Sequence, residues 1–216
     1  MASRLSTADW KALHGIAFFT LLTAATFVPV FRAWPAIWIA PLAGYFALVI
    51  LLPALRRTFT GWSFGRVDKS GLFATLGIAA ISSIALLLFQ RWTQPDLHAY
   101  AAALPRLPGE QIFVAGAVFA VLNAFLEELI FRGVFFTAIE SQVNTTMTVI
   151  ITAALFGYGH MHGYPPGPLG ALLAGIYGLA LGWLRVFTGG LGLPILAHVV
   201  ADATIFYLVV RSGMLS

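Results

Sequence analysis

Residues 123–136 read NAFLEELIFRGVFF, and they place charged side chains inside a long apolar run. The run covers 112–139, and its only charged residues are Glu127, Glu128 and Arg132. Charged groups cost several kcal/mol inside a transmembrane segment, so they are rare there and usually functional. The stretch therefore predicts a membrane-embedded helix that carries a functional site.

The composition of the whole chain supports a membrane setting. Of its 216 residues, 60% are hydrophobic and only 9% are charged, and the mean hydropathy is +0.90. Soluble domains carry about 25% charged residues, so we expect an integral membrane protein whose first partner is the lipid bilayer. The net charge of +4 comes from scattered Lys and Arg residues, which does not suggest nucleic acid. The chain has no cysteine, which excludes disulfides, a thiol nucleophile and cysteine-ligated metal.

Seven apolar runs are long enough to cross a bilayer. Backbone groups in lipid must pair internally, and no alternating barrel pattern is present, so every run is expected to be a helix. The sequence thus predicts an all-α fold, a polytopic transmembrane helical bundle of about seven spans. The runs are 12–31, 36–55, 71–90, 112–139, 145–160, 168–187 and 193–211.

The distribution of basic residues predicts the orientation of the bundle. With seven spans, seven Lys and Arg residues fall on the side of the N-terminus and four on the other side, while Arg132 lies within a span. Basic residues favour the cytoplasmic side, so the N-terminus is expected to be cytoplasmic. The start of the chain has no convincing signal peptide, because its polar start is short and no clear cleavage site follows.

Helical spacing separates the two glutamates. Glu128 and Arg132 are four residues apart on one face, in the order that favours an ion pair, so we expect a structural role for them. Glu127 is rotated by about 100° from Glu128 and has no basic residue three or four positions away. The polar residue on its own face is Asn123. A buried carboxylate without a countercharge suits a general base, so Glu127 is the candidate for chemistry.

Two later runs carry further polar residues at helical spacing. LFGYGHMHG (155–163) places Phe156 and His160 four residues apart, and PILAHVVADATIF (194–206) does the same for His198 and Asp202. One histidine on an apolar face is usually a satisfied core residue, but this whole set in one small bundle indicates a shared polar site. The remaining histidines are expected to be loop, structural or solvated residues: His162, His14 and His98.

Three short motifs carry a family resemblance. EELIFR (127–132), FGYGH (156–160) and HVVAD (198–202) resemble, in order and spacing, the EExxxR, FxxxH and HxxxN/D motifs of the CPBP family of intramembrane proteases. That family includes the CAAX prenyl endopeptidases and the bacterial Abi-type, bacteriocin-processing proteins. The resemblance covers about 111–211. It implies a catalytic helical core at 111–216, formed by the last four spans, and variable N-terminal helices and connectors at 1–110 within one integrated membrane domain.

The resemblance implies hydrolysis of a peptide bond within or near the bilayer. Glu127 would activate the water with His160 beside it, while His198 and Asp202 would bind or polarise the carbonyl and its oxyanion. The supporting residues would be Glu128, Arg132, Asn123 and Phe156. Asp202 departs from the asparagine of well-studied CAAX proteases, and an ionised aspartate cannot donate a hydrogen bond to an oxyanion. Asp202 is thus a neutral donor, an anion that orients His198, or a metal ligand.

The sequence is compatible with both a metal-dependent and a metal-independent mechanism. Glu127, His160, His198 and Asp202 are chemically competent zinc ligands, and a divalent metal such as zinc is one alternative. The sequence has no HExxH motif, which would present two histidines and a glutamate on one helix. We favour a metal-independent glutamate mechanism without a cofactor.

The expected partner is a membrane-associated peptide or protein, and the expected location is a bacterial inner membrane. A C-terminal tail or a signalling peptide is the kind of substrate that bacterial relatives process. The alternative is a non-proteolytic membrane protein, such as an immunity factor or an ion or proton carrier, because intramembrane carboxylates and histidines also serve ion paths. Carriers more often show inverted repeats and paired broken helices, and neither is evident.

Three local features complete the expectations. GWSFG (61–65) fits a nucleophile-elbow motif, but that motif needs a strand–turn–helix unit, so we interpret it as coincidence. Small residues recur every fourth position in the run 168–187, which indicates close helix packing. In a simple up-and-down bundle, His160 and His198 would differ in depth by ~10–15 Å. A short, tilted or broken helix is needed to bring them together.

Overall fold

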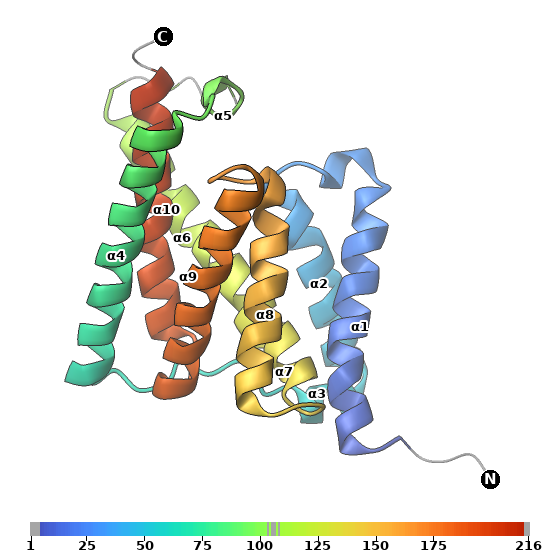
Figure 1. The fold of residues 1–216 in the computed structure, drawn as a ribbon. Coiled ribbons are helices and arrows are strands. Elements are labelled where there is room, and N and C mark those ends of the chain that lie inside the picture. The colour runs from blue at the N-terminus through green and yellow to red at the C-terminus, as the bar shows by residue number, and fades with distance from the viewer. Residues whose placement is uncertain (1–4, 103, 105–106, 108, 214–216) are drawn as a thin grey trace.

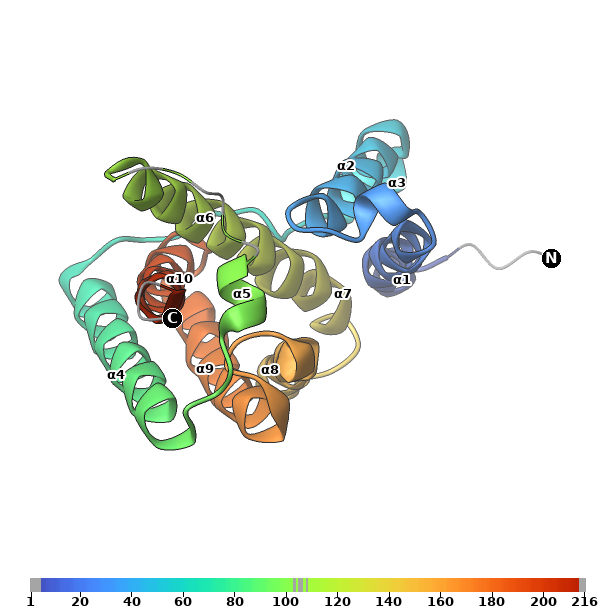
Figure 2. The same cartoon turned by 90° about the horizontal axis from the view of Figure 1, so that it is seen from above.

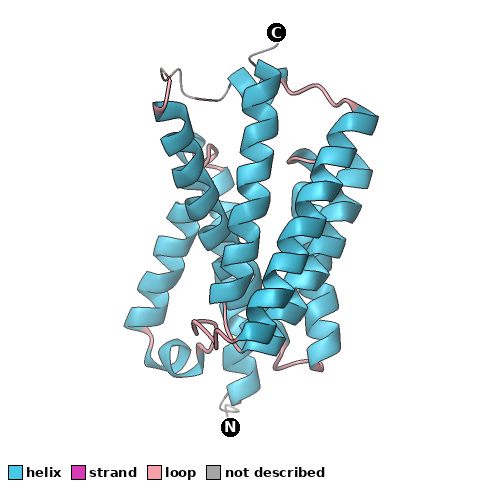
Figure 3. Ribbon diagram, turned by 90° about the vertical axis from the view of Figure 1, so that its left-hand side faces the viewer, coloured by secondary structure: helices cyan, strands magenta, loops and turns pink. Residues whose placement is uncertain are grey.

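All seven predicted apolar runs form helices in the computed structural model, which describes residues 5–213 except 103, 105–106 and 108. No strand occurs in this described part of the chain, as Figure 3 shows. The α-helices are α1 (Thr7–Thr26), α2 (Ala36–Leu51), α3 (Pro53–Thr58), α4 (Lys69–Thr93), α5 (His98–Ala102), α6 (Gln111–Glu128), α7 (Phe136–Ile139), α8 (Thr145–Gly159), α9 (Gly167–Thr188) and α10 (Gly192–Gly213). The other helical segments are η1 (Pro29–Phe31), the π-helical η2 (Leu129–Phe135) and η3 (His160–His162).

Four of these helices are long and apolar enough to cross a membrane. They are α4, the continuous stretch Gln111–Ile139, α9 and α10. The apolar α2 has only 16 residues, and α8 has only 15. The all-helical prediction is therefore confirmed for the described residues, while the count of seven spans stays a prediction.

Local sequence signals set several helix ends. The Asp68 side chain accepts a 2.7 Å hydrogen bond from the Gly71 amide at the start of α4, and Asn144 caps α8 in the same way through Met147. Such caps pair amides that the first turn of a helix leaves free. The C-terminal end of α9 is set by Gly189, whose φ of +73° suits glycine. These signals limit α8 and α9 to the lengths that position the site.

The helices form two groups (Figures 1 and 2). In the larger group α10 lies between α4 and α6, and α8 packs along α9. The smaller group, α1 to α3, packs against the far end of the α6–α7 stretch through α1. The motif-bearing helices α6, α8 and α10 therefore belong to one group, and α4 from the first half of the chain joins them.

Small residues allow α8 and α9 to approach closely. A Cβ atom added at Gly182 would lie 2.9 Å from the Val149 side chain, and one added at Gly178 would lie 3.3 Å from Arg132 Nη2. On the facing helix, a Cβ at Gly157 would lie 2.7 Å from the Ala171 carbonyl oxygen. The predicted packing role of the small-residue stripe, which comprises Gly170, Ala174, Gly178 and Gly182, agrees with these distances.

The connector before α4 is tied to the loop between α9 and α10. The Leu191 amide donates to the Ser63 carbonyl oxygen at 2.8 Å, and the Arg66 amide donates to the Thr188 carbonyl oxygen at 2.9 Å. Ser63 itself is exposed. The segment 61–65 lies in neither a helix nor a strand, so the strand–turn–helix unit of a nucleophile elbow is not formed there.

Candidate active site

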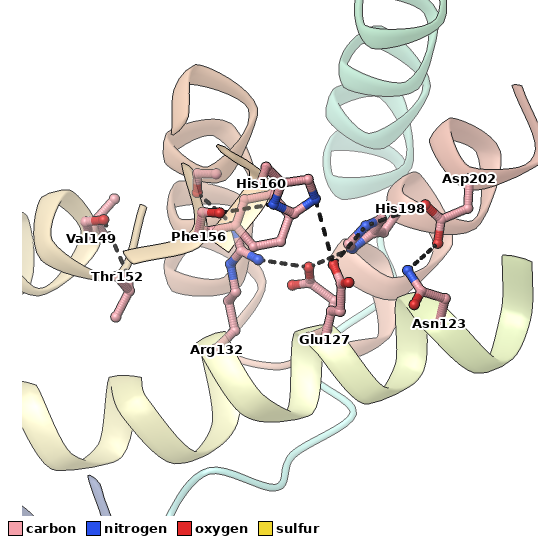
Figure 4. A network of polar contacts seen from close by, with 11 residues as sticks. Asn123, Glu127, Arg132, Val149, Thr152, Phe156, His160, His198 and Asp202 are labelled. Carbon is pink, nitrogen blue, oxygen red and sulfur yellow. Dashed lines mark hydrogen bonds and ion pairs between the residues drawn. The ribbon is translucent and has the colours of Figure 1, made fainter. Parts of the chain in front are cut away.

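The end of α6 carries both glutamates into the interior of the larger helix group, and Figure 4 shows Glu127 facing His160 and His198. Glu127 is 7% exposed and Glu128 is fully buried. The helix continues directly into the π-helical η2, which carries the fully buried Arg132. A π-helical turn inside an α-helix often marks a functional site, and here it follows the two glutamates without interrupting the helix.

Glu128 is the centre of a buried charged network. Its Oε1 atom accepts hydrogen bonds from Arg132 Nη1 and from His198 Nδ1, each at 2.8 Å. Arg132 Nη2 also donates to the Gly178 carbonyl oxygen at 3.0 Å, and its guanidinium lies 4.5 Å from the centroid of the Phe156 ring. The network joins α6, η2, α9 and α10. The spacing of the sequence predicts the Glu128–Arg132 contact but gives no sign of the contact to His198 on another helix.

The partners of the two histidines determine their tautomers when neutral. His160 Nδ1 lies 2.8 Å from the Phe156 carbonyl oxygen, which can only accept, so Nδ1 carries the hydrogen. His198 Nδ1 faces a carboxylate oxygen of Glu128 in the same way. This assignment rests on hydrogen-bond partners rather than on observed hydrogens. In both neutral rings Nε2 is therefore an acceptor.

Both Nε2 atoms face Glu127. Glu127 Oε2 lies 3.7 Å from His198 Nε2 and 4.0 Å from His160 Nε2. The same oxygen is buried and has no hydrogen-bond partner in the described part of the chain. Three acceptors thus surround one point, and a water molecule has two O–H groups to donate there, at about 2.8 Å each. The arrangement can hold a water beside a carboxylate that can take its proton.

The expected depth difference between His160 and His198 does not arise. Both side chains lie within 4.0 Å of the same Glu127 oxygen. The reason is the short α8, which ends at Gly159 and passes into the single turn η3. Figure 1 shows that α8 ends well below the far ends of α4 and α10. A short helix is therefore what brings the FxxxH and HxxxN/D motifs to one level.

The two carboxylate oxygens of Asp202 face different residues, one His198 and the other Asn123. Its Oδ1 lies 3.7 Å from His198 Nε2, and its Oδ2 accepts from Asn123 Nδ2 at 3.1 Å. The Asn123 Oδ1 atom in turn accepts from the Trp34 indole N–H at 3.0 Å. An indole can only donate, so Trp34 fixes which end of the Asn123 amide faces Asp202. Sequence reasoning missed Trp34, because the connector that bears it has no motif.

The site residues do not match the geometry of a zinc centre. Two ligands of a tetrahedral zinc ion are about 3.4 Å apart, whereas Glu127 and Asp202 oxygens lie 3.7 Å or more from the nearest histidine Nε2 atoms. Across residues 5–213, leaving out the undescribed positions, no group of three or more His, Asp or Glu is arranged to hold a metal ion. We therefore derive no step through a metal.

A cavity of about 190 Å³ opens beside these groups. Its walls come from α4, α8, α9, α10 and the segment after η3, and they are mostly apolar. The polar residues of the lining are Ser82, His160, Tyr164, Tyr177, His198 and Asp202. Two lining residues, Ile81 of α4 and Ile176 of α9, are themselves 71% and 56% exposed. Both helices are candidate spans, so the cavity reaches the side of the bundle that faces lipid.

The other three histidines lie apart from this site. His14 is fully buried between Tyr45 Oη and Thr58 Oγ1, at 2.7 and 3.1 Å, which is a structural arrangement. His162 is exposed in η3, and His98 is exposed at the start of α5. The structure therefore brings together Asn123, Glu127, Glu128, Arg132, Phe156, His160, His198 and Asp202, and it leaves His14, His98 and His162 outside.

Comparison with known proteins gives one match. Residues 109–204 match the family model described as type II CAAX prenyl endopeptidase Rce1-like. No curated protein and no solved structure that was compared with the chain matches it. The matched segment contains all three motifs and spans α6 to most of α10. Together with the four apolar helices, the match supports an integral membrane protein that is similar to a peptidase family over residues 109–204.

Proposed function

We propose that the chain is an intramembrane endopeptidase of the glutamate type, on the premise that residues 109–204 match the family model described as type II CAAX prenyl endopeptidase Rce1-like. Glu127 activates the hydrolytic water, and His160 and His198 hold that water in place. The catalytic core is the part from α6 to α10.

One observation carries the proposal. Glu127 Oε2 is a buried carboxylate oxygen that faces the acceptor nitrogens of His160 and His198 at 4.0 and 3.7 Å. A general base must lie within reach of the proton that it takes, directly or through one water. A water that donates one O–H to Glu127 has its second O–H for an imidazole Nε2, and its oxygen lone pair is then free for attack from the cavity side. Glu128 differs because its Oε1 atom is paired with Arg132 and His198, although its Oε2 atom is also buried without a partner in the described residues.

The reaction follows from this geometry. The Glu127 carboxylate takes one proton from the water while the water oxygen bonds to the carbonyl carbon of the substrate. The carbonyl oxygen becomes the oxyanion of a tetrahedral intermediate. The protonated Glu127 then gives its proton to the amide nitrogen, the C–N bond breaks, and the oxyanion returns to a carbonyl. The products are a carboxylic acid and an amine, and Glu127 is again a carboxylate.

The surrounding residues position this machinery. Glu128 fixes the ring of His198 through Nδ1, and Arg132 balances the charge of Glu128. Phe156 lies under the His160 ring, with the centroids 4.4 Å apart, and its carbonyl fixes the tautomer. Asn123 holds Asp202 beside His198. Asp202 Oδ2 can accept this bond in either protonation state, so the three roles that the sequence allows for Asp202 stay open.

The position and lining of the cavity favour a substrate that enters from the membrane. Its lining is mostly apolar, and it reaches the lipid-facing side between α4 and α9. A hydrophobic segment or a lipid-modified tail can enter from that side without leaving the bilayer, while its peptide bond reaches His198. The matching family model is described as a type II CAAX prenyl endopeptidase. We propose a membrane-associated peptide or protein as the substrate class, and a bacterial inner membrane as the location.

A reconstituted cleavage assay tests the proposal. The purified chain is placed in liposomes with a fluorogenic farnesylated peptide that ends in a CAAX sequence, and in parallel with a hydrophobic single-span peptide that ends in a polar tail. We expect hydrolysis of at least one peptide, and no change of its rate after treatment with a metal chelator. Loss of activity on chelation, with recovery on adding zinc, would overturn the metal-independent mechanism. Absence of cleavage with both peptides would favour a non-proteolytic immunity or carrier protein.

A further inference from the structure

A buried hydroxyl on α9 has no assigned role. Tyr177 lies in the helix between the two histidine-bearing motifs, and its side-chain oxygen is buried without a hydrogen-bond partner in the described part of the chain. Buried tyrosine hydroxyls usually find a partner, and an unpaired one is costly. The neighbouring Tyr164 follows this rule, because its hydroxyl donates to Gln90 Oε1 at 2.8 Å. The unpaired Tyr177 hydroxyl therefore needs a functional explanation.

The hydroxyl belongs to the cavity of the candidate site. Tyr177 lines the cavity together with His160, His198 and Asp202. Its ring stands edge-on to the His198 ring, with centroids 5.7 Å apart and an angle of 87° between the planes. The buried hydroxyl thus belongs to a side chain that packs against His198 and lines the cavity of the site.

The reaction gains from a hydrogen-bond donor at the carbonyl oxygen, and two hydroxyls of the cavity already have acceptors, since Ser82 donates to the Ala79 carbonyl oxygen and Tyr164 donates to Gln90. The carbonyl oxygen gains negative charge in the tetrahedral intermediate, and a preorganised donor there is among the largest single contributions to catalysis. His160 and His198 present acceptor Nε2 atoms in their neutral tautomers, and the Oδ2 atom of Asp202 is occupied by Asn123. A tyrosine O–H can donate. Tyr177 is thus the donor that complements these acceptors.

We propose that the Tyr177 hydroxyl donates a hydrogen bond to the carbonyl oxygen of the scissile peptide bond, and that this bond strengthens as the oxyanion forms. The inference rests on the proposed peptidase function. No proton is transferred from Tyr177, so its O–H bond stays intact through the cycle. The substrate oxygen is the partner that the hydroxyl lacks, which makes Tyr177 a catalytic residue that lies outside the three motifs.

Tyr177→Phe tests the inference, because it removes the hydroxyl and keeps the ring against His198. We expect kcat in the liposome assay to fall by ~100-fold, the range for loss of one oxyanion donor, while KM changes by less than about threefold. The unfolding temperature of the variant should not fall, because an unpaired buried hydroxyl is removed and no hydrogen bond is lost. Tyr158→Phe is the matched control, since Tyr158 lies on α8 and is 78% exposed, and it should keep the wild-type kcat.

Two results would overturn the role of Tyr177. One is a kcat of Tyr177→Phe close to that of wild type, and the other is a loss that appears only in KM or together with a lower unfolding temperature. A Glu127→Gln variant in the same assay keeps the two proposals separate. If Glu127→Gln is inactive and Tyr177→Phe retains full kcat, only the Tyr177 inference fails. If Glu127→Gln cleaves as fast as wild type, the proposed function of the site fails.

Discussion

Two adjacent glutamates of one helix lie in different environments. Glu128 Oε1 accepts hydrogen bonds from Arg132 and His198, and the charge of Arg132 balances that of the carboxylate. Glu127 faces acceptor nitrogens at 3.7 and 4.0 Å and keeps a free oxygen. A step of about 100° around the helix is enough to separate these environments. One carboxylate therefore serves the structure, while the other is available to take a proton.

The first prediction concerns Glu128→Gln. The amide keeps the shape of the side chain but leaves the fully buried Arg132 without an anion. Breaking a buried pair by removing one partner costs about 3–5 kcal/mol. We expect a loss of this size in the free energy of unfolding, measured by denaturant titration in detergent. Cleavage should fall as well, since His198 loses the carboxylate that fixes its ring.

Glu140→Gln is the control for that measurement. Glu140 pairs with Lys11 at 3.5 Å, and the two side chains are 29% and 24% exposed. A partly exposed pair of this kind contributes about 0–1 kcal/mol, so the control should unfold close to wild type. Equal stability of Glu128→Gln and wild type would show that the buried network is not structural.

At the scale of the elements, close contact between α8 and α9 determines where His160 lies. Gly157 is three residues before His160, and a Cβ atom there would lie 2.7 Å from the Ala171 carbonyl oxygen and 3.0 Å from Gly175 Cα. Both contacts are to the backbone, which cannot rotate away as a side chain can. The glycine therefore sets the separation of the two helices and, through it, the position of His160 relative to Glu127.

The second prediction follows from this contact. Gly157→Ala should push α8 away from α9, lower the stability by about 1–3 kcal/mol and reduce cleavage by displacing His160. Thermal unfolding and the liposome assay measure the two effects. Gly77→Ala is the control, because a Cβ atom at Gly77 of α4 meets nothing within 4 Å. That change should preserve activity and slightly favour the helix. A Gly157→Ala protein with wild-type stability and rate would contradict the close-packing account.

The third prediction concerns the segment between α1 and α2. The Trp34 indole N–H fixes the amide of Asn123, which holds Asp202. Trp34→Phe removes one neutral hydrogen bond, worth about 1 kcal/mol, so kcat should fall by about fivefold with the fold intact. Trp92→Phe is the control, since Trp92 is 75% exposed at the end of α4. An unchanged kcat for Trp34→Phe would exclude any influence of this segment on the site.

The sequence predicts the elements of the site better than their mutual placement. Spacing along one helix is enough to predict that Glu128 lies near Arg132 and that His198 lies near Asp202, because residues four apart share a face. The contacts from Glu128 to His198 and from Trp34 to Asn123 join separate helices, which no periodicity reports. Because α8 is short, His160 and His198 lie at the same depth. The helix ends at His160, and the only sequence signals of that end are the nearby glycines and prolines. Tyr177 belongs to none of the three motifs, so its place in the site could not be predicted from the sequence.

At the scale of the whole molecule, the site draws on both halves of the chain. The motifs lie in the second half, but α4 packs against α10 and supplies Ile78, Ile81 and Ser82 to the cavity wall. From the sequence, α4 is predicted to be a variable span, because it carries none of the polar motif residues. A lipid-facing cavity needs only apolar residues of suitable shape on such a wall, so composition alone does not reveal it.

The fourth prediction concerns orientation in the membrane. Figure 1 places the start of α1 and the connector before α4 at one end of the bundle, and the end of α4 at the other. Arg56, Arg57 and Arg66 lie in or near that connector, and basic segments favour the cytoplasm. The chain has no cysteine, so Ser63→Cys and Trp92→Cys variants give single labelling sites. In intact cells, a membrane-impermeant thiol reagent should label Trp92→Cys and leave Ser63→Cys unlabelled; the reverse pattern would invert the proposed topology.

The most direct test of the central claim is the cleavage rate of Glu127→Gln in liposomes. The amide preserves the size of the side chain at a carboxylate oxygen that has no hydrogen-bond partner in the described residues, so the protein should fold and unfold like wild type. Without a carboxylate to take the proton of the water, kcat should fall by ~100-fold or more. A correctly folded Glu127→Gln protein that cleaves at the wild-type rate would contradict the assignment of Glu127 as the base.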